Sequence, residues 1–319
     1  MTTTEAPWTI AERSGARGFV TELDRGPIHW VRWDSDEPLT DDPILLVHGL
    51  GGSHLNWTLV APALAAGRTV YAVDLRGFGL SPGHRVGDSK VIANTDLVIH
   101  FIAHLIGAPV VLMGNSMGGM ISAMVASSRP DLVRQLVLVN PALPMARLKL
   151  DPVVAGRFAM FSVPGAGEAV MRRARRGTDP EVAARQLLEL CFADADRVRP
   201  EVLEQGIELA VTRAHPDTGL GDVEKSFMVA ARSLMGALAR RPRYLRMLGA
   251  IDVPVLLVHG DKDRLVDVAS ARAVARRHPT WDYVEFADVG HTPQLEVPEE
   301  FVDIVCRWLA APSATEAGR

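Results

Sequence analysis

The sequence predicts an α/β fold in which a mostly parallel sheet carries helices on both faces. Short, purely apolar segments recur at residues 44–47, 110–113 and 253–258. Strands of a parallel sheet have this composition because helices cover both faces and remove the polar alternation. Helical segments separate the strands and glycine-rich loops follow them, as expected when helical crossovers join parallel strands.

The first 140 residues follow this alternation after an irregular start. Residues 1–15 are polar, and we expect them to be loosely held. Residues 18–23 and 28–33 flank Asp24-Arg-Gly-Pro27, which predicts a β-hairpin leading into the sheet. The elements expected next are a strand at 44–47, a helical segment at 55–66, a strand at 69–75, a helix at 89–106, a strand at 110–113, a helix at 117–128 and a strand at 135–140.

The alternation stops at Pro141. Residues 142–250 contain only helical segments rich in Arg, Ala, Leu and Met. It then resumes with a strand at 253–258, a helix at 268–277, a strand at 281–286 and a helix at 299–310. We therefore predict a core domain of residues 1–141 and 251–319, interrupted by a helical cap at residues 142–250.

Composition and charge exclude several classes of protein. Hydrophobic residues make up 48% of the 319 residues and charged residues 23%, as in ordinary globular proteins. The net charge of −4 gives no reason to expect nucleic-acid binding. Cys191 and Cys306 lie far apart without metal-ligand spacing, so we expect free thiols in a reducing compartment. Residues 1–10 lack a secretory pattern and no apolar run reaches about 18 residues, so we expect a cytoplasmic protein without a transmembrane span.

The strongest chemical motif is Gly114-Asn-Ser-Met-Gly118, which joins an apolar strand to a helix. A serine in a tight turn of this kind stands exposed at the carboxyl edge of the sheet, beside the amino terminus of a helix. Backbone N–H groups there can stabilise a developing negative charge. The motif alone is weak, because glycine and serine also build ordinary turns.

A serine hydroxyl needs a base, and the base needs an orienting group. The strand at 253–258 is followed by a loop containing Asp261, Asp263 and Asp267, and the last strand is followed by His291. Both loops belong at the same edge of the sheet as Ser116. The chain order of serine, aspartate and histidine is that of hydrolases built on this sheet.

Several motifs in order resemble α/β-hydrolase-fold serine hydrolases with a helical cap, namely HGLGG at 48–52, DLRGFGLS at 74–81, GNSMGG at 114–119, GDKD at 260–263 and GHTPQLEVPE at 290–299. The resemblance implies a triad of Ser116, Asp263 and His291, with Asp261 as the less favoured acid. It also implies an oxyanion hole formed by the backbone N–H groups of Leu50 and Met117. No cofactor and no metal are implied.

Other polar residues are given no catalytic role. His100 and His104 have a metal-like spacing, but they fall on the polar side of an amphipathic helix. His48 and His259 end buried strands and are interpreted as structural. Structural roles are also expected for Asp74, Arg76 and Glu296.

The predicted cap differs in charge from the rest of the chain. It has 17 Lys and Arg against 13 Asp and Glu, whereas the remainder has 17 against 25. Basic clusters at 172–176 and 240–243 indicate either solvated helix faces or contact with an anionic substrate or a lipid surface. Six methionines would suit an adaptable apolar wall, namely Met145, Met160, Met171, Met228, Met235 and Met247.

We expect the substrate to be a small-molecule ester with an apolar acyl group, such as a monoacylglycerol, enclosed by the cap. One alternative is hydrolysis of carbon–carbon bonds in ring-cleavage products, because GNSMGG also resembles those enzymes. They usually have a tryptophan where this chain has Thr292, and a proline that HGLGG lacks. A cofactor-free perhydrolase and a catalytically silent ligand-binding protein are further alternatives. Dehalogenases and epoxide hydrolases are disfavoured because they resemble this pattern with aspartate at position 116. The sequence does not indicate an oligomeric state.

Overall fold

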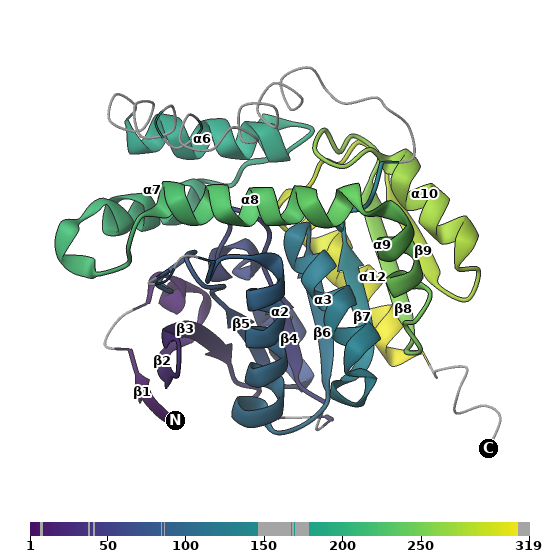
Figure 1. Ribbon diagram of the computed structural model, residues 1–319, viewed down its shortest axis with the longest axis horizontal. Helices are drawn as coiled ribbons and strands as arrows, with labels where there is room; N and C mark the ends of the chain where they lie inside the picture. The colour runs from purple at the N-terminus through teal and green to yellow at the C-terminus, as the bar shows by residue number, and fades with distance from the viewer. Residues whose placement is uncertain are drawn as a thin grey trace.

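The computed structural model describes residues 1–311 except 7–8, 38, 41, 84, 86, 146–166, 168 and 170–178. These residues form a nine-stranded sheet in the order β1-β2-β3-β5-β4-β6-β7-β8-β9. The strands are β1 (Thr2–Glu5), β2 (Arg17–Leu23), β3 (Gly26–Trp33), β4 (Ile44–Val47), β5 (Val70–Val73), β6 (Val110–Asn115), β7 (Val133–Val139), β8 (Val255–Gly260) and β9 (Asp282–Phe286). The first three strands are antiparallel to their neighbours, and the remaining six run parallel (Figure 1).

Helices cover both faces of the sheet, because alternate apolar residues of each strand point to opposite sides. Leu45 and Val47 belong to one buried cluster, which α2 (Val91–His100), α3 (Met117–Ser128), α9 (Arg241–Leu248) and α10 (Val268–Arg277) complete. Ile44 and Leu46 belong to a second cluster, completed by α1 (Ala61–Leu64) and α12 (Pro298–Ala310). This arrangement confirms the predicted α/β-hydrolase fold class.

Three helices cross above the carboxyl edge of the parallel strands and are here called the covering helices (Figure 1). They are α6 (Pro180–Cys191), α7 (Pro200–Ala214) and α8 (Val223–Ala239). By contrast, α9 packs against α3, where the Tyr244 hydroxyl donates to the Ala142 carbonyl at 2.8 Å. The boundaries given above for the cap therefore remain a prediction.

The start of the chain is more ordered than expected. β1 pairs with β2, and a short 3-10 helix (Ile10–Ser14) buries Ile10 and Ala11. The expectation of a loosely held segment was wrong, because the polar side chains of β1 lie on an exposed edge strand whose backbone is nevertheless paired.

The predicted helical segment at 55–66 is divided into a 3-10 turn (His54–Trp57), α1 and a second 3-10 turn (Ala65–Gly67). Pro62 in the first turn of α1 explains the division, because proline has no N–H to continue an earlier helix. None of the described helices has both the length and the apolar composition required to cross a bilayer.

Candidate active site

Ser116 lies at the sharp turn between β6 and α3. Its backbone has φ 56° and ψ −117°, a strained conformation for a residue with a side chain. The flanking glycines make the turn possible. A Cβ at Gly114 would lie 2.4 Å from the Gly118 carbonyl oxygen, and one at Gly118 would lie 2.2 Å from the Val47 oxygen. Both positions therefore exclude larger residues.

His291 and Asp263 approach this edge from the loops after β9 and β8. The His291 Nδ1 lies 2.7 Å from Asp263 Oδ2, and both residues are buried. The other carboxylate oxygen accepts the backbone N–H groups of Leu265 and Val266 at 2.8 and 3.0 Å. Burial alone would raise the pKa of Asp263. The neighbouring His291, His259 and Asn140 lower it by more, so the pKa lies below its ordinary value. Asp263 is therefore held as a carboxylate against the imidazole.

Two further residues support this pair and were not singled out for it from the sequence. Asn140, which follows β7, donates through Nδ2 to Asp263 Oδ2 at 2.8 Å and to the Gly290 carbonyl at 3.1 Å. The His259 ring lies 3.4 Å from the same carboxylate oxygen and bonds the Val266 carbonyl at 2.8 Å. Asn140 could have been suspected, because it too ends an apolar strand at the carboxyl edge.

The loop after β4 passes directly beside Ser116. A Cβ at Gly49 would lie 3.0 Å from the Ser116 Cβ. His48 fixes this loop by donating from Nδ1 to the Gly49 carbonyl at 2.7 Å and accepting the Leu75 N–H at Nε2, 3.0 Å away. Burial lowers the pKa of His48 to about 4, so the ring is neutral and can accept that bond. The geometry agrees with a structural rather than a basic role.

The candidate oxyanion amides lie on either side of the serine. Met117 is the first residue of α3, where an N–H has no partner within the helix. Leu50 follows Gly49 and lines the same cavity as Ser116 and His291. Among the hydrogen bonds of the described residues, none joins Ser116 Oγ to the His291 ring. In acyl-transfer enzymes this contact often tightens only when substrate binds.

The cavity that contains Ser116, Asp263 and His291 has a volume of about 860 Å³. The covering helices supply most of its apolar wall, through Leu187, Leu188, Leu190, Val202, Leu209, Ala210, Phe227, Leu234, Met235 and Leu238. Arg213 also lines it and donates to the carbonyls of Gly77 and Gly79. The volume of the cavity falls within the range of small-molecule sites.

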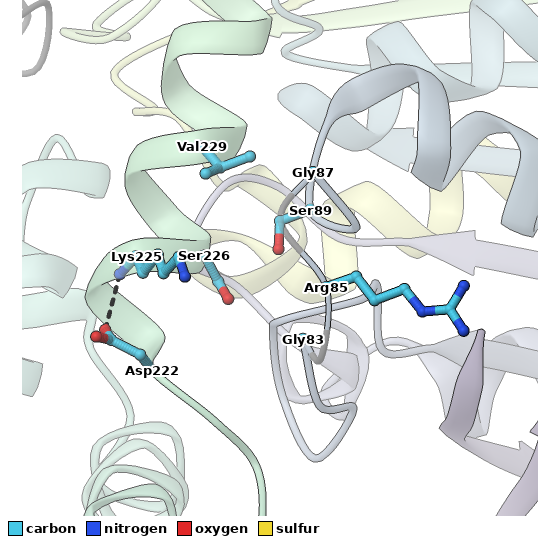
Figure 2. Close-up of a pocket in the computed structure, with 8 residues that line it drawn as sticks. All are labelled: Gly83, Arg85, Gly87, Ser89, Asp222, Lys225, Ser226 and Val229. Atoms are coloured by element: carbon cyan, nitrogen blue, oxygen red, sulfur yellow. Dashed lines mark hydrogen bonds between the residues drawn. The ribbon is translucent and has the colours of Figure 1, made fainter. Parts of the chain in front are cut away.

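A second, smaller cavity of about 140 Å³ lies between the loop after β5 and the start of α8 (Figure 2). The hydroxyls of Ser89 and Ser226 face it, whereas the Arg85 side chain extends away. None of the candidate catalytic residues lines it. The large cavity is therefore the candidate active site.

A sequence model of the alpha/beta hydrolase family matches residues 44–304. The chain belongs to the α/β-hydrolase family. One relative of the chain is the dihydrolipoyllysine-residue acetyltransferase component of the acetoin cleaving system of Pseudomonas putida, 30% identical over 261 residues and 81% of this chain. The chain spans only about 60% of that relative's length.

Two relatives are covered over most of their length. An esterase of Mycobacterium tuberculosis is 25% identical over 299 residues, covering 92% of this chain and 91% of the relative. The 2-hydroxymuconate semialdehyde hydrolase of Pseudomonas sp. strain CF600 is 26% identical over 280 residues, covering 85% of this chain and 88% of the relative. The chain is thus similar both to an esterase and to a 2-hydroxymuconate semialdehyde hydrolase.

The other residues singled out from the sequence occupy several places in the fold. Asp261 accepts the Asp288 N–H at 2.7 Å and pairs with Lys262, so it is not the carboxylate bonded to His291. His100 and His104 are exposed, with ring centroids 4.5 Å apart. Met145 and Met235 line the cavity, whereas Met228 is buried and Met247 packs against the core. Met160, Met171 and the basic cluster at 172–176 lie outside the described residues, and lipid contact stays a prediction.

A second buried aspartate–histidine cluster lies behind the loop after β4. Asp74 accepts hydrogen bonds from the Nδ1 atoms of His29 and His54 at 2.8 and 2.9 Å. It also accepts the backbone N–H groups of His54 and Leu80. These three side chains form the metal-ligand-like group found among the described residues. Four hydrogen bonds to one carboxylate already account for its geometry, which agrees with a structural Asp74.

Proposed function

We propose that this chain is a serine hydrolase that cleaves carboxylic esters with an apolar acyl group through an acyl-enzyme at Ser116. One observation carries the proposal: the strained serine and the aspartate-bonded histidine open into the same large, mainly apolar cavity. A merely structural serine would have no reason to occupy a strained conformation at the floor of a cavity.

In the proposed cycle, His291 takes the proton of Ser116 as the serine oxygen attacks the ester carbonyl. Asp263 keeps the ring oriented and stabilises its positive charge. The N–H groups of Leu50 and Met117 stabilise the oxyanion, and losing one such donor costs about 3–4 kcal/mol of barrier. His291 then protonates the leaving alcohol, and a water molecule repeats the sequence to release the acid.

The cavity wall supports an apolar acyl group. Apart from Arg213 of α7, the side chains that α6, α7 and α8 contribute are mainly Leu, Ala, Val, Phe and Met, which are apolar. Each buried methylene of a ligand contributes about 0.8 kcal/mol. Catalytic efficiency should therefore rise with acyl-chain length until the cavity is filled.

Carbon–carbon bond hydrolysis is the second candidate, supported by the similarity to 2-hydroxymuconate semialdehyde hydrolase. It would use the same serine and histidine on a substrate that carries a carboxylate and a keto group. The cationic side chains of Arg213 and Arg264 also line the cavity, so the preference for the ester rests on the apolar wall from α6, α7 and α8.

The test uses the purified chain with p-nitrophenyl esters of two to twelve carbons, and Ser116→Ala as the control. We expect turnover that increases with chain length, fluorophosphonate labelling of the wild type, and loss of both in the variant. Faster turnover of a 2-hydroxy-6-oxo-dienoate than of any ester would establish the second candidate. An inert wild type would favour the ligand-binding alternative, and equal turnover by Ser116→Ala would contradict any mechanism that uses Ser116 as the nucleophile, including that of a perhydrolase.

A further inference from the structure

The carboxyl end of α6 is hydrogen-bonded directly to the loop that carries His291. The backbone N–H of His291 donates to the Cys191 carbonyl at 2.6 Å. The two segments are so close that a Cβ at Gly290 would lie 2.3 Å from that carbonyl oxygen and 2.6 Å from the Ala193 nitrogen. The candidate base is therefore anchored to a covering helix as well as to the sheet.

Glu296, the last residue of α11 (Pro293–Glu296), lies at the centre of this junction. Its side chain is buried, and Oε2 accepts the Gly290 N–H at 2.7 Å. Oε1 accepts the N–H groups of Ala193 and Asp194 at 3.0 and 3.1 Å. One carboxylate thus binds backbone groups on both sides of the junction. Hydrogen bonds to an ionised acceptor are about twice as strong as neutral ones.

Arg197 continues the same link at the surface. Its Nη1 donates to the Asp288 carbonyl at 2.7 Å and lies 3.5 Å from Glu296 Oε1. Both the buried carboxylate and the half-exposed guanidinium therefore connect the segment after α6 to residues 288–290. This segment and the histidine loop form one hydrogen-bonded unit.

We propose that Glu296 is a positioning residue that couples the segment at 191–194 to His291. The proposal rests on the proposed function, because it assigns Glu296 a role in holding the base of that reaction. Displacing a catalytic group by about 1 Å can cost about 100-fold in rate. The covering helices would thus contribute to the orientation of the base in addition to enclosing the substrate.

The main test is Glu296→Gln, which keeps the shape of the side chain. The variant has one acceptor oxygen, and its NH₂ group must face N–H donors, so at least one backbone N–H loses its partner. We expect kcat to fall about 10- to 100-fold with KM within about threefold, measured well below the unfolding temperature. A residue that only stabilised the fold would change the unfolding temperature and leave kcat of the folded enzyme intact.

Glu299→Gln is the matched control. Glu299 also pairs with an arginine, Arg199 at the start of α7, but Arg199 is half-exposed and Glu299 is largely exposed. Among the hydrogen bonds of the described residues, none joins the Glu299 side chain to the histidine loop. The charge change is the same as in Glu296→Gln, so unchanged kcat and KM are expected. A comparable loss in this control would attribute the effect to net charge and overturn the proposal.

Two further measurements keep the test decisive. If Glu296→Gln does not fold, Arg197→Gln replaces it. This half-exposed position should tolerate the change and lower kcat about two- to fivefold, a smaller loss than that from the buried carboxylate. In the variant that folds, amide hydrogen exchange should be faster than in the wild type, both in peptides covering 190–197 and in peptides covering 286–292. This measurement needs no substrate. Unchanged exchange, or unchanged kcat in the folded variant, overturns the proposal. Absence of Ser116-dependent turnover in the wild type would instead defeat the proposed function, while exchange would still test the link.

Discussion

Two buried aspartate–histidine clusters in this protein share the same contact and differ in their surroundings. In the first, His291 bonds Asp263 at 2.7 Å, and in the second, His29 bonds Asp74 at 2.8 Å. Both aspartates have a lowered pKa, with histidine donors countering the effect of burial. The contact alone therefore does not distinguish a catalytic cluster from a structural one.

The difference lies in access and in the neighbouring hydroxyl. Asp263 and His291 line the large cavity together with Ser116, whereas His29 and Asp74 do not. The hydroxyl beside His29 belongs to Ser81, which is fully buried and accepts the His29 backbone N–H at 2.9 Å. An aspartate–histidine cluster can take part in catalysis only where a nucleophile and a substrate can reach the histidine ring.

The largest expected difference in kcat is between variants of the two histidines, His291 and His29. His291→Gln should lower kcat for ester hydrolysis about 10⁶-fold, because the serine loses its base. His29→Gln should leave kcat of the folded enzyme within about threefold and instead lower the free energy of unfolding by about 1–3 kcal/mol. Steady-state kinetics and urea denaturation of both variants provide the measurement. Equal losses of kcat would place the second cluster in the catalytic machinery.

The second largest difference in activity is expected between variants of the two aspartates. Asp263→Asn should lower kcat about 10⁴-fold, because the amide no longer holds the productive tautomer of His291. Asp74→Asn replaces one acceptor oxygen of the buried cluster by an NH₂ group that faces N–H donors, and should cost about 1–3 kcal/mol of stability for each donor left unpaired. We expect its folded fraction to retain activity. A stable Asp74→Asn protein would show that the second cluster adds little to the fold.

The pH dependence of stability sharpens the comparison further. Burial lowers the pKa of His29 below its ordinary 6.5, so the unfolded chain takes up a proton first and stability falls as the pH drops from 6.5 through the folded pKa. The lowered pKa of Asp74 adds stability that is present above 3.8 and is lost as the pH falls through the folded value.

Urea denaturation between pH 7 and pH 4.5 isolates the histidine part of this dependence. His29→Gln should flatten the slope by up to about 1.4 kcal/mol per pH unit, the value for one proton. A slope identical to that of the wild type would show that His29 does not titrate differently in the folded and unfolded states.

The strands and the later helices could be predicted because their signals are local. The predicted helix at 268–277 coincides with α10, which begins where Asp267 caps the Ala269 N–H. The first 15 residues could not be predicted, because β1 is stabilised by pairing with β2 and its own residues are polar. Single-sequence patterns do not report such long-range pairing.

The candidate triad was accessible from the sequence because each member lies in a loop or turn that follows a predicted parallel strand, at one edge of the sheet. Glu296 lies within a recognised motif, but its partners Ala193 and Asp194 are about 100 residues away. No local pattern indicates where that segment passes. The role of Asn140 likewise depends on its hydrogen bond to Asp263, which follows a different strand, so the sequence around Asn140 does not indicate it.

The smallest expected effect is that of Ser81→Ala, which contrasts with that of Ser116→Ala. Ser81→Ala leaves the buried His29 N–H without its acceptor and should cost about 1–3 kcal/mol of stability. Because Ser81 is sealed from the cavity, kcat of the folded variant should equal that of the wild type, as measured with the best p-nitrophenyl ester. Ser116→Ala should show the opposite pattern, with lost activity and nearly unchanged stability, since the Ser116 hydroxyl faces the cavity. A loss of kcat in fully folded Ser81→Ala would mean that the second cluster communicates with the first through the loop after β4, and the separation of the two would fail.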